Sequence, residues 1–379
     1  MMRILWWTTR FWPDVGGVEV MGAALLAEME SRGHELAVVT GPQLSPDAEQ
    51  AADGVRPPPG ISIHRFPLLS PLAAADPAML FEIRQEIETL ISSFSPDLIH
   101  LHTLGPHAAL CSWILERKTL PLLVTVQEAM LAELDLGTET LPGRLLRRAD
   151  RVNCVSRFMA DIVLEAVPEI ASRCEVIPNS LPTPEPAPSE LPFEPPVLLG
   201  LGRLVREKGF DLVLQALARI LPTFPRTRLI LTGDGPERGA LEDLARSLKV
   251  AHAVTFAGAL PPEGVPALLN QVTAAVVPSR CQEAFGLVAL QAAQMGRPVI
   301  AARRGGLDEI VADRESGLLV EPGKPGSLAD GMTAILEHPD FARRLGRQAR
   351  RIAEKRFAWL QTVNRYHELY TRISKDDRT

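Results

Sequence analysis

The chain alternates short apolar runs with longer segments in which apolar residues recur every three or four positions. Short runs bounded by turn residues are typical of buried strands, and the longer periodic segments are typical of helices. In the first half, the pattern predicts helices over about 18–32, 78–93 and 106–117. It predicts strands at Arg3 to Thr9, Glu35 to Thr40, Ile61 to Phe66, Asp97 to Leu101, Leu122 to Val126, Asp150 to Val155 and Cys174 to Ile177. This alternation indicates a parallel sheet with helices on both faces.

A proline-rich segment divides the pattern. Eight of the nineteen residues from Pro178 to Pro196 are proline, and proline stiffens an extended chain while offering no N–H to a sheet. The boundaries that we predict are 1–180 for a first domain, 181–196 for a linker, 197–355 for a second domain and 356–375 for a final helix. The second domain should contain strands at Val197 to Leu201, Arg228 to Leu231, Ala253 to Phe256, Val272 to Pro278 and Pro298 to Ala301, with helices over about 207–221 and 237–248. The predicted fold class is α/β, with two Rossmann-like doubly wound domains.

Length, charge and cysteine spacing narrow the functional classes. A length of 379 residues suits two domains. Forty basic and forty-six acidic residues give a net charge of −6, which provides no global attraction for nucleic acid. The four cysteines are far apart and form no metal or disulfide spacing, so we expect no metal site and a reducing, cytoplasmic location. The apolar start of the chain is too short for a signal peptide, and 98–115 contains histidines, glycine and proline unsuited to a membrane span.

One acidic residue stands out between a predicted strand and a predicted helix. Glu283 follows the apolar run ending at Pro278 and precedes an apolar helical segment. In an open parallel sheet this is the carboxyl end of a strand, where ligands bind. The N–H groups of the following helix start favour an anion, so a carboxylate there should face a ligand hydroxyl. The alternative is that Glu283 only charges the first helical turn.

Cations and glycine pairs follow other strands. Arg203 and Lys208 lie in a loop after the strand Val197 to Leu201, where a guanidinium fork and a mobile ammonium suit a diphosphate. A solvated basic turn is the alternative. The pairs Gly16-Gly17 and Gly305-Gly306 permit close backbone approach to a ligand, although a plain tight turn also explains the first pair.

The order of these motifs resembles a known family. Gly202-Arg-Leu-x-x-x-Lys-Gly209, Gly233-x-Gly-Pro236, Pro278-Ser-x-x-x-Glu-x-Phe-Gly286 and Gly305-Gly-x-x-Glu-Ile-Val311 are similar to the family-4 retaining glycosyltransferases of the GT-B fold. The resemblance covers nearly the whole chain and is strongest over 197–320. It implies two Rossmann-like domains facing a central cleft, and a final helix that returns to the first domain.

The resemblance also implies roles for individual residues. Glu283, Arg203 and Lys208 would be catalytic. The donor-binding set would be Gly16, Gly17, Arg203, Lys208, Glu283, Ala284, Phe285, Gly286, Leu287, Val288 and Gln291. The acceptor or sugar side would be formed by Gln127, His102, Gly305 and Gly306.

The implied reaction transfers a sugar from a UDP- or GDP-sugar, with no cofactor or metal. Cations and helix starts would stabilise the leaving diphosphate, which gains charge in the transition state. The family's front-face route lets the diphosphate help deprotonate the acceptor hydroxyl, so Glu283 would orient the sugar and stabilise positive charge. The acceptor would be a small molecule, a glycan or a lipid-linked compound.

Two residues depart from the family pattern. The second acid of Glu-x7-Glu falls on Gln291, and a frequent histidine falls on Gln127. Successive side chains at a strand end point to opposite faces, so the adjacent Glu128 is no simple replacement. These departures favour an alternative, a nucleotide-sugar-binding protein that is catalytically weak or inactive.

Two further alternatives are less well supported. A tandem Rossmann oxidoreductase would need a strand-borne G-x-G-x-x-G with an acid about twenty residues later, and neither half has one. Peripheral membrane contact through a basic amphipathic surface of Arg144, Arg147, Arg148 and Arg151 with Leu141, Leu145 and Leu146 lacks the usual aromatic residues, and a solvated helix face explains the pattern better.

Overall fold

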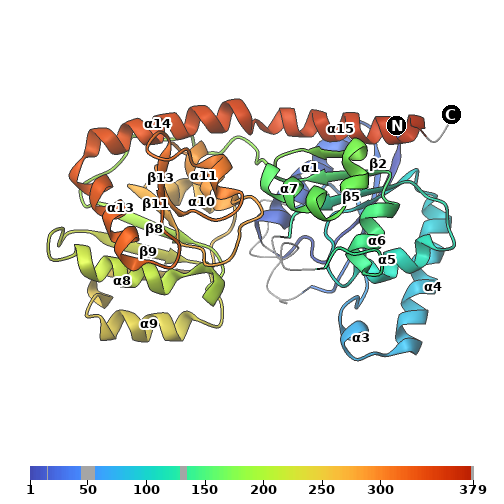
Figure 1. The fold of residues 1–379 in the computed structure, drawn as a ribbon, viewed down its shortest axis with the longest axis horizontal. Helices are drawn as coiled ribbons and strands as arrows, with labels where there is room; N and C mark the ends of the chain where they lie inside the picture. Colours follow the sequence, from blue (N-terminus) through green and yellow to red (C-terminus); the bar gives the residue numbers. More distant parts are fainter. Residues whose placement is uncertain (15, 44–55, 129–134, 377–379) are drawn as a thin grey trace. The chain divides into compact units, whose positions relative to one another are not determined.

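The computed structural model describes residues 1–14, 16–43, 56–128 and 135–376. The chain forms two units. Unit 1 contains Met1–Asn179 together with Leu360–Thr379, and unit 2 contains Ser180–Trp359. Each unit has one parallel sheet with helices on both faces, which confirms the predicted fold class (Figure 1).

Unit 1 has a seven-stranded sheet in the order β3-β2-β1-β4-β5-β6-β7. The strands are β1 (Arg3–Trp7), β2 (Glu35–Thr40), β3 (Ser62–Arg65), β4 (Leu98–Leu101), β5 (Leu122–Val126), β6 (Arg151–Cys154) and β7 (Cys174–Val176). The helices are α1 (Gly17–Ser31), α3 (Ser70–Ala73), α4 (Pro77–Phe94), α5 (Ala108–Leu115), α6 (Leu141–Arg148), α7 (Arg157–Ala166) and α15 (Trp359–Asp376). The strand order reverses between β1 and β4, and in such sheets this reversal marks the ligand crevice.

Unit 2 has a six-stranded sheet in the order β10-β9-β8-β11-β12-β13. The strands are β8 (Val197–Leu201), β9 (Arg228–Thr232), β10 (Val254–Gly258), β11 (Ala274–Val277), β12 (Val299–Ala302) and β13 (Gly317–Val320). The helices are α8 (Phe210–Ile220), α9 (Arg238–Ser247), α10 (Gly264–Leu269), α11 (Leu287–Gln294), α12 (Leu307–Ile310), α13 (Pro325–Glu337) and α14 (Pro339–Arg356). Here the order reverses between β8 and β11, the two strands that precede the predicted donor-site loops.

The helix predicted to start near residue 207 begins later. Residues Arg206–Lys208 form a 3-10 turn, Gly209 has φ of +70°, and α8 starts only at Phe210. A side chain on Gly209 would also collide with the carbonyl oxygen of Pro278, at the end of β11. The glycine therefore lets the loop after β8 reach the loop after β11, and the periodicity of α8 gives no sign of this interruption.

The last helix of the chain is held in unit 1 by buried polar side chains as well as by apolar packing. Tyr366 and Tyr370 of α15 are fully buried. The Tyr370 hydroxyl lies 2.8 Å from His100 Nδ1 on β4, and the amide of Asn153 on β6 donates to the Tyr366 hydroxyl at 2.8 Å. His100 Nε2 in turn lies 2.7 Å from the Thr125 hydroxyl on β5. Polar residues of three neighbouring strands thus contribute to the surface on which α15 packs.

One buried cation helps to attach the proline-rich segment to unit 2. Arg297, at the start of the turn before β12, is 0% exposed. Its guanidinium donates to the carbonyl oxygens of Ser189 and Glu190 at 2.8 and 3.1 Å, and to Asn270 Oδ1 at 2.9 Å. Burial lowers the Arg297 pKa to about 10. These bonds satisfy the two terminal nitrogens of a cation that has lost its water, while Nε has no partner among the described residues.

Several residues of the basic amphipathic surface considered for membrane contact have partners within unit 1. Leu145 and Leu146 of α6 are buried inside unit 1. Arg147 pairs with Glu169 at 2.6 Å, and Arg148 donates to the carbonyl oxygen of Leu120 at 3.0 Å. Within the described residues, no helix has the length and apolar character to cross a membrane.

Candidate active site

Two loops meet at the reversal of strand order in unit 2. Residues 202–209 follow β8, and residues 278–286 follow β11, which pairs with β8 in parallel. Because the carboxyl ends of neighbouring parallel strands lie at the same edge of the sheet, residues far apart in sequence come together there. The backbone N–H of Arg280 donates to the carbonyl oxygen of Glu207 at 2.8 Å, which joins the two loops directly.

Lys208 and Glu283, both predicted as catalytic, are in contact. Lys208 Nζ lies 2.6 Å from Glu283 Oε1, and the side chains are 29% and 15% exposed. The Ser279 hydroxyl donates to the same carboxylate oxygen at 2.5 Å. One oxygen of Glu283 is therefore held by a cation and a hydroxyl. A pair this short and this poorly solvated is a charge-assisted bond rather than a loose surface pair.

The loop that carries Glu283 is fixed at both ends. The Gly306 N–H donates to the Glu283 carbonyl oxygen at 2.7 Å, so the second predicted glycine pair packs directly on this loop. Gly286 has φ of +109° and precedes α11, where a side chain would meet Leu307 Cδ2 at 2.6 Å. Glycine at this position lets α11 start immediately after the loop. The first N–H groups of α11 have no acceptor within the helix, and such groups can bind an anion.

The remaining predicted donor residues of unit 2 differ in their exposure to solvent. Arg203 is exposed and makes no side-chain hydrogen bond or ion pair to any residue that the structure describes, so its guanidinium is available to a ligand. Leu287, Val288 and Gln291 are half-buried on α11. Phe285 is different, because its ring is 3% exposed and packs edge-on against Phe357 at a centroid distance of 5.4 Å. Only its backbone can contact a donor.

The predicted acceptor-side residues of unit 1 form a second cluster. The Gln127 amide, at the end of β5, donates to the carbonyl oxygen of His102 at the end of β4, at 2.6 Å. The His102 ring packs at a tilt against Trp6 with a centroid distance of 4.0 Å, and burial lowers the pKa of His102 to about 3. His102 is therefore a neutral ring at physiological pH. Gly16 and Gly17, at the start of α1, belong to the same unit.

Sequence reasoning missed three polar residues at this edge of the first sheet. Thr9 Oγ1 lies 2.7 Å from His107 Nδ1, and Thr103 Oγ1 lies 3.1 Å from His107 Nε2. His107 is fully buried, and burial lowers its pKa to about 4. The three residues come from loops after β1 and β4, on either side of the reversal. The only signal in the sequence was their position directly after strands.

Glu128 makes a buried contact that its position in the sequence did not indicate. Its Oε1 accepts a hydrogen bond from the Leu104 N–H at 2.9 Å. Burial raises the pKa of Glu128 to about 7. A carboxyl group that titrates near neutrality is unusual, and groups of this kind occur often at functional sites.

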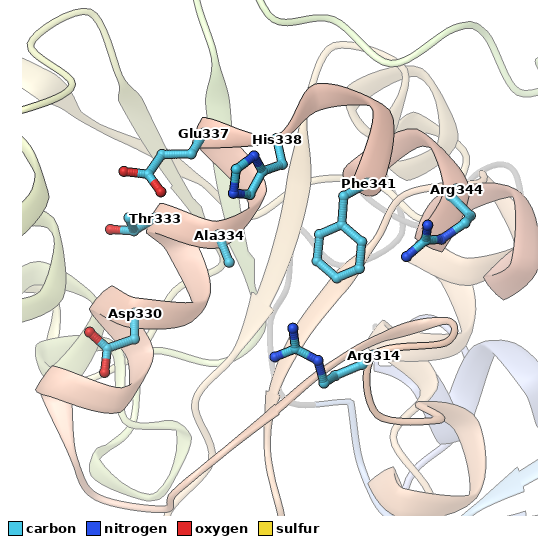
Figure 2. Close-up of a pocket in the computed structure, with 8 residues that line it drawn as sticks. All are labelled: Arg314, Asp330, Thr333, Ala334, Glu337, His338, Phe341 and Arg344. Carbon is cyan, nitrogen blue, oxygen red and sulfur yellow. The ribbon is translucent and has the colours of Figure 1, made fainter.

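A separate surface pocket of about 410 Å³ lies on unit 2, and Figure 2 shows the side chains that line it. Arg314 and Arg344 flank the ring of Phe341, with guanidinium carbons 6.0 and 5.1 Å from its centroid. Asp330 and Glu337 also line the pocket, so its charges balance. The lining contains none of the predicted site residues. The charged loops at the carboxyl ends of β8 and β11 are a better candidate for binding a diphosphate.

Two family models match the chain, Glycosyltransferase Family 4 over residues 15–185 and Glycosyl transferases group 1 over residues 183–352. A D-inositol 3-phosphate glycosyltransferase from Acidothermus cellulolyticus is 31% identical over 97% of this chain and 88% of its own length. The chain belongs to the family-4 glycosyltransferases.

Other relatives of this glycosyltransferase span its full length. A glycogen synthase from Mycobacterium tuberculosis is 28% identical over 100% of the chain and 96% of its own length. Among solved structures, sucrose-phosphate synthase from Thermosynechococcus elongatus matches with a TM-score of 0.84 and 23% identity, covering 98% of this chain and 99% of that one. HepE from Anabaena in complex with UDP-glucose matches with a TM-score of 0.75 and 21% identity, covering 98% and 100%. The glycosyltransferase therefore has the GT-B fold.

Proposed function

We propose that this glycosyltransferase moves a sugar from a nucleotide-diphosphate sugar to an acceptor hydroxyl, with retention of anomeric configuration and without a metal ion. The observation that carries the proposal is the meeting of Lys208 and Glu283 at the reversal of strand order in unit 2. A UDP- or GDP-sugar is the donor class that we propose. HepE, a protein of the same fold, was solved with UDP-glucose, which supports this choice.

The charges at this edge suit the chemistry of the leaving group. Cleavage of the anomeric C–O bond places negative charge on the diphosphate. In our proposal, Lys208 and Arg203 stabilise that charge together with the N–H groups at the start of α11. Such groups lower the barrier because they bind the charged transition state more strongly than the ground state. The proposed reaction therefore needs no divalent cation to handle the leaving diphosphate.

We assign Glu283 to the sugar rather than to covalent attack. Its Oε1 is already held by Lys208 Nζ and the Ser279 hydroxyl. A carboxylate fixed in this way can accept hydrogen bonds from sugar hydroxyls and stabilise positive charge on the ring. In a front-face reaction, the departing diphosphate takes the proton of the acceptor hydroxyl, and the new bond forms on the side from which the diphosphate leaves.

The acceptor is a small molecule, a glycan or a lipid-linked compound in this proposal, and Gln127 and His102 belong to its side of the reaction. The structure describes no group of three or more His, Cys, Asp and Glu side chains with metal-binding geometry.

The decisive experiment incubates the purified protein with UDP- and GDP-sugars and follows donor hydrolysis and transfer. We expect one donor to be consumed and the product to keep the donor's anomeric configuration by NMR. An inverted product would contradict retention.

A second candidate is a nucleotide-sugar-binding protein with little or no activity. Gln127 favours it, because its amide N–H is bound to the His102 carbonyl oxygen rather than free for a sugar. The variant Gln291→Glu restores the acid of the family pattern and separates the candidates. Under our main proposal it changes donor affinity by less than roughly tenfold, because bonds to charged groups exceed neutral ones by only about 1 kcal/mol. A rise in turnover of more than a hundredfold would favour the inactive protein.

A further inference from the structure

We propose that Arg280 and Asp211 act as a clamp that holds Lys208 and Glu283 in their reactive arrangement. This inference rests on the proposed transferase function. Neither residue is assumed to touch substrate. Both are positioning residues that act through the loops after β8 and β11.

The clamp joins three segments of unit 2. Arg280 Nη1 and Nη2 donate to the two carboxylate oxygens of Asp211 at 2.5 and 2.6 Å. Asp211 lies in the first turn of α8, directly after the loop that carries Lys208. Arg280 Nη1 also donates to the carbonyl oxygen of Arg206 at 3.3 Å. Arg280 itself lies three residues before Glu283, so one side chain connects both sides of the site.

The ion pair of Arg280 and Asp211 fixes the positions of the two loops more than it stabilises the fold. The side chains of Arg280 and Asp211 are 33% and 32% exposed, and pairs of this exposure contribute little to the free energy of folding. Two parallel bonds between planar groups nevertheless fix both distance and orientation. Lysine has a single ammonium group and cannot reproduce that fork.

The site has little tolerance for movement of these loops. Gly209 packs against the carbonyl oxygen of Pro278 so closely that no side chain fits between them. The contact between Lys208 and Glu283 in the same two loops is also short, at 2.6 Å. A displacement of about 1 Å in a reacting group can cost on the order of a hundredfold in rate. Loss of the Arg280 fork should therefore reduce turnover more than it reduces stability.

The test compares Arg280→Lys and Asp211→Asn with a matched control. Arg226 and Glu194 also form a forked pair in unit 2, at 3.2 and 3.4 Å, but it is 71% and 78% exposed and contacts neither loop. We expect Arg280→Lys and Asp211→Asn to lower kcat by about tenfold to a hundredfold, with KM for the donor changing less than about threefold. Arg226→Lys should leave both constants unchanged. The melting temperatures of all three variants should stay within a few degrees of the parent.

A double variant tests whether the clamp acts through Glu283. Because the clamp positions Glu283 as well as Lys208, Arg280→Lys should cost less in a Glu283→Gln background than in the parent, so the two losses together should be smaller than their product. Fully multiplicative losses would overturn the clamp. So would a kcat for Arg280→Lys equal to that of Arg226→Lys in an active parent enzyme. A parent that neither binds UDP or GDP nor consumes any donor would overturn the transferase proposal and the clamp together.

Discussion

Lys208 Nζ and Glu283 Oε1 lie 2.6 Å apart although 75 residues separate them in the chain. The contact exists because β8 and β11 are neighbours in the sheet and each ends immediately before one of the two loops. The ammonium group that we assign to the diphosphate is thus also the partner of the Glu283 carboxylate.

Removal of either proposed phosphate-binding cation should weaken nucleotide binding. We expect Lys208→Ala and Arg203→Ala each to reduce the affinity for UDP or GDP by about 1.5–3 kcal/mol, the range for a charge-assisted bond. Isothermal titration calorimetry measures this directly. Lys324→Ala is the control, because Lys324 is an exposed cation of the same unit whose ammonium lies 3.9 Å from Glu321. Unchanged affinity in both site variants would remove the donor site from this edge of the sheet.

Glu283→Gln should separate turnover from binding. We expect turnover to fall by on the order of a hundredfold or more, because a preorganised charge aimed at the reacting sugar is lost. Donor affinity should change much less, since the variant also frees Lys208 from its carboxylate partner. Steady-state kinetics with the identified donor gives both constants. An active Glu283→Gln enzyme would mean that the reaction occurs elsewhere.

Chelation should leave the enzyme active. Because the proposed leaving-group charge is stabilised by Lys208, Arg203 and helix N–H groups, turnover in excess EDTA should match turnover without it. The assay is run with and without added Mg²⁺ or Mn²⁺. If activity disappears in EDTA and returns with a divalent cation, the charge of the diphosphate is handled by a metal instead.

Acidification should destabilise unit 1 between about pH 6.5 and 4. Burial lowers the pKa of His34 to about 4 and of His102 to about 3. The unfolded chain takes up protons near pH 6.5 while the folded chain does not, so stability present above pH 6.5 is lost as the pH falls. Calorimetry from pH 7.5 to 4.5 should show a falling Tm, and His34→Gln should flatten the profile. A Tm that rises on acidification would contradict this account.

The contribution of Glu128 to stability changes with pH in the opposite direction to that of the histidines, which provides an internal check. Its folded pKa of about 7 lies above its ordinary value of 4.5. Its contribution to stability is therefore complete below about pH 4.5 and is lost as the pH rises through 7. Glu128→Gln, which cannot ionise, should raise the Tm more at pH 8 than at pH 5. An equal effect at both pH values would mean that the carboxyl group does not ionise in this range.

The strands were the most predictable part of the molecule. The predicted bounds of Glu35–Thr40, Leu122–Val126 and Val197–Leu201 match the structure, because a buried parallel strand needs an unbroken apolar run. The strand Gly317–Val320 was not predicted, since its apolar run is only three residues long and directly follows a polar turn. The late start of α8 was missed for a different reason. In the sequence, Gly209 fits the helical pattern, and only its contact with Pro278 shows that the helix starts after it.

The contacts within the site were less predictable than the residues that make it. Motif spacing identified Glu283 and Lys208, but their ion pair depends on which strands are neighbours, and the apolar pattern does not specify strand order. Arg280 lies inside a motif at a position the motif leaves open. Its partner Asp211 reads as an ordinary acid in the first turn of a helix. Long-range polar contacts of this kind follow from the assembled sheet.

The placement of α15 in unit 1 has a consequence for the order of events on the ribosome. Unit 2 is continuous in sequence, whereas unit 1 is completed by residues that are synthesised after unit 2. Until α15 emerges, His100 and Asn153 lack their tyrosine partners, and the apolar surface that later packs on Val363, Tyr366 and Leu369 is open to water. Exposed apolar surface of this kind attracts chaperones and promotes aggregation. The half of the protein that is translated first is thus the half that finishes folding last.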